Sequence, residues 1–355
     1  MTGRERLHCA LNHQEPDMVP VFECVYSRHI FQEQFGFIPK TFDPVSVIEL
    51  SHKMGYDFAF IPIPGVAGFP PEEEVDTIYV DEWGITRKSD PNTWPIDAGI
   101  KSPLESADDW AGYKMPDPEA EFRYIGLAEC LRRAEAYGMG VIGNMRGPFS
   151  AAWQLFGMEE FLCMFYTDPD VVHEALTACT DFAIACSRRM AKMGVDALIY
   201  SDDYGSTQAP LFSPETFREF MAPQLKRIKA VADELGLKMI LHSDGNIAKL
   251  IPEIIACGID GLHPIQRCAD MEIGDIKTRY GDKLTLFGNI DNVGVLVSGT
   301  EEDIDAMVKD CIHKAAPGGG YCLGSDHSVH DDIPNRNVYA MCEAARKYGH
   351  YPIEV

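Results

Sequence analysis

Short apolar runs alternate along this chain with longer segments in which apolar residues recur at helical spacing. This alternation is typical of βα units built around a parallel sheet. Eight runs read as strands: Val19–Phe22, Phe58–Ile61, Val141–Gly143, Ala197–Tyr200, Met239–Leu241, Gly261–Leu262, Leu284–Phe287 and Tyr321–Leu323. The intervening helices are expected at Pro44–Lys53, Ile125–Tyr137, Pro169–Met193, Pro214–Leu235, Ile247–Cys257, Ile273–Tyr280, Glu301–Lys314 and Asn335–Tyr348.

Eight strands that are each followed by a helix predict a (β/α)₈ barrel. A doubly wound dinucleotide-binding sheet is disfavoured, because no G-x-G-x-x-G follows any predicted strand. The stretch Thr77–Pro116 breaks the rhythm with alternating apolar residues, which predicts a small antiparallel ribbon inserted after the second strand. Without an internal repeat or a long linker, residues 1–355 are expected to form a single domain.

Polar residues follow most of the predicted strands. In such a barrel the loops after the strands meet at one mouth, where catalytic groups lie. The candidates there, in chain order, are Glu23, Asn144, Arg146, Asp202, Asp203, Tyr204, His242, Asp244, His263, Asn289, Asp291, Asp326 and His327.

Two histidines and a carboxylate suggest a metal site. His242 and His327 follow the fifth and eighth strands, and the His242-x-Asp244 spacing presents two ligands from one strand end. Imidazole and carboxylate ligands with one open position describe a catalytic zinc site. The alternative is structural: His242 bonds a loop carbonyl and Asp244 caps the helix that starts near Asn246.

The other candidates also allow two interpretations. Asp202 and Asp203 are adjacent, so their side chains point to opposite faces; one is expected to act as a catalytic carboxylate and the other to bind backbone amides. Asp291 either takes part in catalysis or caps the following helix. Residues proposed to contact substrate, with a structural role as the alternative, are Glu23, Asn144, Arg146, Tyr204 and His263.

Charge and composition narrow the class of partner. The chain carries 31 Lys and Arg against 55 Asp and Glu, a net charge of −24 that repels nucleic acids and anionic membranes. No apolar run is long enough to span a membrane, and the start of the chain does not resemble a signal peptide. Eleven scattered Cys without a C-x-x-C pair suggest reduced thiols, so a cytoplasmic location is expected.

Several motifs together resemble the uroporphyrinogen decarboxylase superfamily over essentially the whole chain. The matching segments are Arg4-Glu5-Arg6-Leu7, Pro16-Asp17, Val19-Pro20, His242-Ser243-Asp244-Gly245, Gly288-Asn289-Ile290-Asp291 and Gly318-Gly319-Gly320-Tyr321 leading to Asn337. The resemblance implies a (β/α)₈ fold and one of two activities. One branch decarboxylates porphyrinogens, and the other exchanges methyl groups with a corrinoid protein.

The sequence departs from both branches. The decarboxylases carry an arginine-rich segment after the first strand, whereas this chain has Glu23 and a single Arg28 there, and its acidic mouth would repel a porphyrinogen. The methyltransferases bind zinc through His-x-Cys and a later Cys. The resemblance places His242, Asp244 and His327 at these positions. Nitrogen and oxygen ligands are harder than thiolates, so a thiol as methyl acceptor is in doubt, whereas a zinc ion that acts on an oxygen atom of the substrate suits this ligand set.

The resemblance therefore implies a zinc-dependent methyltransferase that moves a methyl group from a small donor, an O-methyl compound, to cob(I)alamin. Because the chain lacks an Asp-x-His-x-x-Gly motif, the cobalamin is expected on a separate corrinoid protein docked at the barrel mouth. Two alternatives stay open: a cofactor-free decarboxylase of a small carboxylic acid, and a non-catalytic barrel that binds a ligand or a corrinoid protein. The sequence does not determine the oligomeric state, and a homo-oligomer is one of the possibilities.

Overall fold

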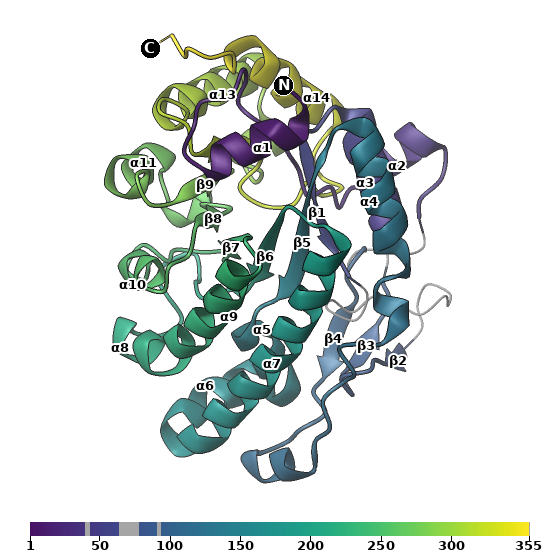
Figure 1. Cartoon of the computed structure of the whole chain (residues 1–355), viewed down its shortest axis with the longest axis vertical. Coiled ribbons are helices and arrows are strands. Elements are labelled where there is room, and N and C mark those ends of the chain that lie inside the picture. The colour runs from purple at the N-terminus through teal and green to yellow at the C-terminus, as the bar shows by residue number, and fades with distance from the viewer. Residues whose placement is uncertain (40–42, 64–77, 91–93, 355) are drawn as a thin grey trace.

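The centre of the protein is a curled parallel sheet surrounded by helices (Figure 1). A computed structural model describes residues 1–39, 43–63, 78–90 and 94–354. Seven strands pair in the order β1-β5-β6-β7-β8-β9-β10, all in parallel. Their bounds are β1 Phe58–Pro62, β5 Gly140–Arg146, β6 Ala197–Ser201, β7 Lys238–His242, β8 Gly261–His263, β9 Thr285–Phe287 and β10 Tyr321–Cys322.

The segment Val19–Phe22, predicted as the first strand, closes the barrel without forming a regular strand. Leu323 N–H donates to Pro20 O (2.9 Å) on the β10 side, and Asp57 N–H donates to Val21 O (2.8 Å) on the β1 side. Pro20 has no N–H to give to a ladder, and the N–H of Val21 is bound by the Asp57 carboxylate at 2.8 Å. The expected (β/α)₈ barrel is confirmed, with the irregular segment Val19–Phe22, called the irregular stave below, in the place of a first strand.

Six of the eight predicted helices agree closely with the observed ones, and shorter helices are added between them. The helix predicted at Pro214–Leu235 is divided by a π-helical segment at Phe217–Met221, and the one predicted at Ile247–Cys257 spans only Ile251–Ala256. Proline or a polar cap starts several of them, as where the Asp43 carboxylate accepts the N–H groups of Val45 and Ser46 at 2.9 and 3.0 Å. The α-helices are α1 Gly3–Leu11, α2 Arg28–Phe35, α3 Pro44–Met54, α4 Ile125–Tyr137, α5 Pro148–Phe156, α6 Met158–Thr167, α7 Pro169–Met193, α8 Pro214–Thr216, α9 Ala222–Glu234, α10 Ile251–Ala256, α11 Ile273–Tyr280, α12 Val295–Ser298, α13 Glu301–Ala315 and α14 Asn335–Tyr348.

Two apolar cores form, one between the sheet and the helices and one inside the barrel. The inner core includes Phe22, Phe58, Phe60, Ile142 and Phe287, and α1 adds apolar side chains to it. Helix α1 packs across the N-terminal ends of the strands, where Arg4 N–H donates to Gly138 O at 2.9 Å. Because this end of the barrel is filled, access is left at the opposite end, where the strands finish.

The predicted insertion is a three-stranded antiparallel sheet, with β2 Ile78–Val80, β3 Thr86–Lys88 and β4 Ala98–Lys101 in the order β2-β3-β4. Its first turn forms because the Asp81 carboxylate accepts the N–H groups of Trp83 and Ile85, both at 2.9 Å. The third strand was not foreseen in the sequence. Residue 77, the first of the predicted insertion, lies outside the described residues.

No helix in the described part of the chain is both long enough and apolar enough to cross a membrane.

Candidate metal and substrate site

A cavity of about 290 Å³ opens where β5, β6, β7 and β8 end. The register of these strands aligns Arg146, Ser201, His242 and His263 in one row, and all four side chains line the cavity. Paired residues of a parallel sheet point to the same face, so the barrel itself brings this row together at its mouth.

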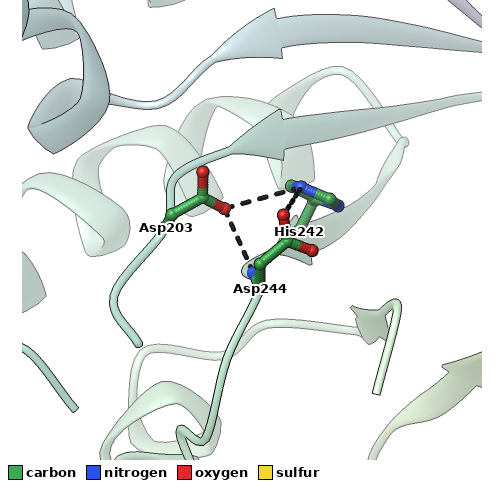
Figure 2. Close-up of side chains that lie close together, drawn as sticks. All are labelled: Asp203, His242 and Asp244. Carbon is green, nitrogen blue, oxygen red and sulfur yellow. Dashed lines mark hydrogen bonds and ion pairs between the residues drawn. The ribbon is translucent and has the colours of Figure 1, made fainter. Parts of the chain in front are cut away.

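Four metal-ligating side chains converge at one side of the cavity. Asp203, His242 and Asp244 each place one ligand atom within 4.8 Å of the others, and Figure 2 shows them turned toward one another. His242 Nε2 lies 3.5 Å from Asp203 Oδ1 and 3.8 Å from Asp244 Oδ2. His327 Nε2 lies 3.0 Å from Asp244 Oδ2, so the loop after β10 adds a fourth donor.

The chemistry of this cluster fits a divalent cation. Asp244 Oδ1 is buried and has no hydrogen-bond partner among the described residues. A buried carboxylate oxygen without a partner is costly unless a cation or water satisfies it. Burial opposes ionisation of Asp244, but the imidazoles of His242 and His327 hold its pKa at about 2, while burial raises the pKa of Asp203. Two imidazoles and two carboxylates are ligands that zinc accepts.

His263 orients the ring of His242 rather than joining the cluster. The two Nδ1 atoms lie 2.6 Å apart, so one imidazole donates a hydrogen bond to the other. Burial lowers the pKa of His263 well below the usual value, which keeps this ring neutral and able to accept. If His242 donates from Nδ1, its Nε2 lone pair is directed at the two carboxylates, the arrangement common for metal-bound histidines.

The structure separates the two adjacent aspartates. Asp203 faces the cavity, whereas Asp202 is fully buried and accepts hydrogen bonds from the N–H groups of Phe149 (3.3 Å) and Ser150 (2.6 Å) and from Tyr204 Oη (2.6 Å). Gly147 allows this approach, because a Cβ there would lie 2.2 Å from Asp202. Asp202 therefore holds the start of α5 in place.

Five other candidates, Glu23, Tyr204, Asn289, Asp291 and Asp326, are absent from the described lining of the cavity. Asn289 donates to Met271 O at 2.8 Å, and Asp326 accepts the N–H of Asn292 at 2.9 Å. Glu23 is buried and accepts a hydrogen bond from Ser325 Oγ at 2.7 Å. Tyr204 is buried against Asp202, and Asp291 caps the turn into α12 by accepting the N–H groups of Val293 and Gly294 at 3.0 and 2.8 Å. The catalytic assignments of Asp202 and Asp291 and the substrate assignments of Glu23 and Tyr204 are therefore left out of the proposed site.

Asn144 and Arg146 do line the cavity, from alternate positions of β5. Ser201 Oγ donates to Asn144 Oδ1 at 3.0 Å, which fixes the amide and leaves its N–H groups for a ligand. Arg146 Nη1 donates to Gln154 Oε1 at 3.0 Å. Both side chains are positioned to contact a bound molecule.

Several lining residues were not among the predicted site residues. Gln154 comes from α5, Ile96 precedes β4 of the insertion, and Cys24 and Tyr26 follow the irregular stave. Their only sequence signal is aromatic or polar character near a predicted strand end. The insertion thus supplies part of one cavity wall.

Similar proteins include enzymes of two kinds. The methylcobamide:CoM methyltransferase MtbA of Methanosarcina mazei is 32% identical over 219 residues, which cover 61% of this chain and 61% of that protein. A uroporphyrinogen decarboxylase of Coxiella burnetii is 27% identical over 278 residues, covering 76% and 74% of the two chains. The match with this chain spans only 57 to 61% of the length of the methyltransferase relatives that match first.

Solved structures confirm the architecture. A methyltransferase from Methanosarcina mazei superposes with a TM-score of 0.76 over 98% of this chain and 99% of that one, at 21% identity. At this identity the likeness concerns the fold alone. The family model described as "Uroporphyrinogen decarboxylase (URO-D)" matches residues 95–348, which include the whole row from Arg146 to His263 and His327. The chain therefore belongs to the uroporphyrinogen decarboxylase family.

Proposed function

We propose that the protein is a zinc-dependent methyltransferase that passes the methyl group of a small O-methyl compound to the cob(I)alamin of a separate corrinoid protein. The observation that carries this proposal is the convergence of Asp203, His242, Asp244 and His327 at the cavity, with Asp244 Oδ1 buried and unpaired. Similarity to a methylcobamide:CoM methyltransferase supports the reaction class. A cytoplasmic location, a single domain and the corrinoid partner are part of the same proposal.

Each cavity residue has a defined task in this proposal. Three of the four side chains Asp203, His242, Asp244 and His327 would hold the zinc, which leaves one coordination position open for the donor oxygen, and His263 fixes the ring of His242. Zinc bound there supplies a Lewis acid that stabilises negative charge on the donor oxygen as the methyl group leaves. Because Ser201 fixes the side-chain amide of Asn144, the N–H groups of Asn144 can donate to the oxygen of the methyl donor.

The ligand types argue for an oxygen leaving group. Two carboxylates and two imidazoles make a harder site than one with thiolates, so the bound ion stays a stronger Lewis acid. A CH₃–O bond needs such help, because an alkoxide or phenoxide is a poor leaving group. Phe60, Ile96 and Trp153 make part of the cavity wall apolar and exclude water from the reacting groups.

The proposal is tested by removing one ligand. His242→Ala is expected to lose bound zinc, measured by elemental analysis, and to lose at least about 100-fold in methyl transfer to cob(I)alamin, followed by the cobalt absorption band. The matched control is His52→Ala, which removes an exposed histidine of α3 that stacks on Tyr137 far from the cavity lining. Full transfer by a chelated, metal-free protein would exclude the zinc mechanism.

A decarboxylase of a small carboxylic acid is the competing function, favoured by the similarity to a uroporphyrinogen decarboxylase over 76% of the chain. The cavity carboxylates Asp203 and Asp244 would repel a second carboxylate bound next to them. Release of CO₂ from a carboxylic acid by metal-free protein, without methyl transfer, would establish this function in place of the methyltransferase.

A further inference from the structure

Arg146 is a charged group of the cavity with most of its hydrogen-bonding capacity unused. It ends β5, lines the cavity, and makes one hydrogen bond, from Nη1 to Gln154 Oε1 at 3.0 Å. A guanidinium offers five N–H donors in a planar fork. No carboxylate of the described residues forms an ion pair with it. The remaining donors therefore have no partner among the described residues.

The surroundings of Arg146 do not neutralise it. Gln154 is neutral and also accepts from Arg87 Nη2 at 3.1 Å, so two guanidinium groups share one amide oxygen. The nearby Asp81 is bound by Arg87 at 2.5 Å. Burial lowers the pKa of Arg146 to about 9, which still leaves the group charged at neutral pH. A partly desolvated cation without a counter-ion is costly, and an anionic ligand would offset that cost.

The spacing between Arg146 and the metal ligands suits one small molecule. Arg146, Ser201 and His242 are register partners on β5, β6 and β7, so two strand spacings, about 10 Å, separate the strand positions of Arg146 and His242. The lining of the same cavity also includes the apolar side chains Phe60 and Trp153. A single ring with polar groups at opposite ends fits this arrangement.

We propose that Arg146 anchors a carboxylate of the methyl donor, so that the donor is an anionic O-methyl compound with its acid group at the end opposite the methyl ether. The inference rests on the proposed function for the position of the methyl group. The carboxylate lies against the guanidinium fork, which favours bidentate pairing, and stays apart from Asp203 and Asp244. Arg146 thus sets both the charge and the orientation of the donor.

The test compares 4-methoxybenzoate with its neutral analogue 4-methoxybenzamide, using zinc-loaded full-length protein. Calorimetric titration measures binding without a corrinoid protein, and transfer to cob(I)alamin is measured separately. The wild-type protein is expected to bind the acid at least about 10-fold more tightly than the amide, because only the acid forms a charge-assisted pair with the guanidinium. Arg146→Gln is expected to abolish that preference while keeping amide affinity within a few-fold.

A second variant guards against misfolding of Arg146→Gln. Gln154→Glu places a carboxylate where the amide now accepts from Arg146, so it should occupy the guanidinium and lower acid binding without removing the arginine. Arg132→Gln is the matched control, since Arg132 is an exposed arginine of α4 paired with Glu129. Its acid-to-amide ratio is expected to equal that of the wild type.

The outcomes separate this inference from the proposed function. Equal binding of acid and amide, no binding of either compound, or an unchanged ratio in both Arg146→Gln and Gln154→Glu would overturn the anionic donor. Arg146-dependent binding of the acid without any methyl transfer would support the anchor and contradict the methyltransferase. Transfer from neutral donors with no effect of Arg146→Gln would contradict the anchor alone.

Discussion

Asp202 and Asp203 are neighbours in the sequence but have opposite roles in the structure. The strand alternation at the end of β6 turns Asp203 toward the metal ligands and Asp202 toward the start of α5. Burial raises the pKa of Asp202 to about 7, although Tyr204 and two backbone N–H groups stabilise the carboxylate. A titratable residue with a shifted pKa is therefore not by itself a catalytic residue.

This difference predicts that replacement by asparagine affects stability at Asp202 and zinc binding at Asp203. Asp202→Asn sets an amide N–H against groups that donate to the carboxylate, so we expect the free energy of unfolding to fall by about 1–3 kcal/mol. Asp203→Asn is expected to keep that stability in chelated protein and to weaken zinc binding. Urea denaturation and metal titration of both variants measure the two effects. Equal loss of stability in both variants would contradict the separation.

At the scale of elements, the seam between β10 and β1 depends on one side chain. Asp57 accepts hydrogen bonds from Val21 N–H and from Arg6 Nη1, both at 2.8 Å, and so joins the irregular stave to α1. Its carboxylate takes the place of a strand ladder that Pro20 interrupts. Helix α1 is therefore part of the closure of the barrel and not an accessory.

Asp57→Ala is expected to lower the free energy of unfolding by about 3 kcal/mol, because Val21 N–H and one side of Arg6 lose a buried partner. Asp17→Ala is the matched control. Asp17 is the other partner of Arg6, and because the Asp17 side chain is 42% exposed, its removal should lower the free energy of unfolding by less than about 1 kcal/mol. Hydrogen exchange at Val21 should accelerate in Asp57→Ala only. Similar stability of the two variants would show that the seam does not need Asp57.

Across the whole barrel, the residues proposed to bind zinc connect distant parts of the structure. They come from the ends of β6 and β7 and from the loop after β10, so one ion would bind three loops together. The chain also carries a net charge of −24, and a cation neutralises part of the negative charge at the mouth. Metal binding should therefore stabilise the fold as well as support the reaction.

Zinc at 100 times its dissociation constant is expected to raise the free energy of unfolding by about 2.7 kcal/mol over chelated protein, since an ion that binds only the native state stabilises it by mass action. Thermal or urea denaturation with and without a chelator measures the change. His242→Ala should show no difference between the two conditions. A wild-type protein equally stable in both would argue against a metal at these residues.

The helices and strands and their order along the chain could be predicted from local sequence patterns. Helices α4, α7, α11 and α14 begin and end at the predicted residues, and the eight apolar runs became seven strands and the closing stave. This succeeds because periodicity, proline and caps act within a few residues of the chain. The barrel followed from counting those units, and the insertion from the break in their rhythm.

Which polar residues share the cavity could not be predicted in this way, because it depends on how distant segments pack. Glu23 follows a predicted strand like His242, yet its partner is Ser325, 302 residues away, and it is absent from the described lining of the cavity. Contacts between strands, which no local pattern encodes, place Asp203 beside His242 and Asp244 and give Arg146 no ion-pair partner among the described residues. The partners of a polar side chain depend on packing between distant segments, and these partners separate a binding residue from a structural one.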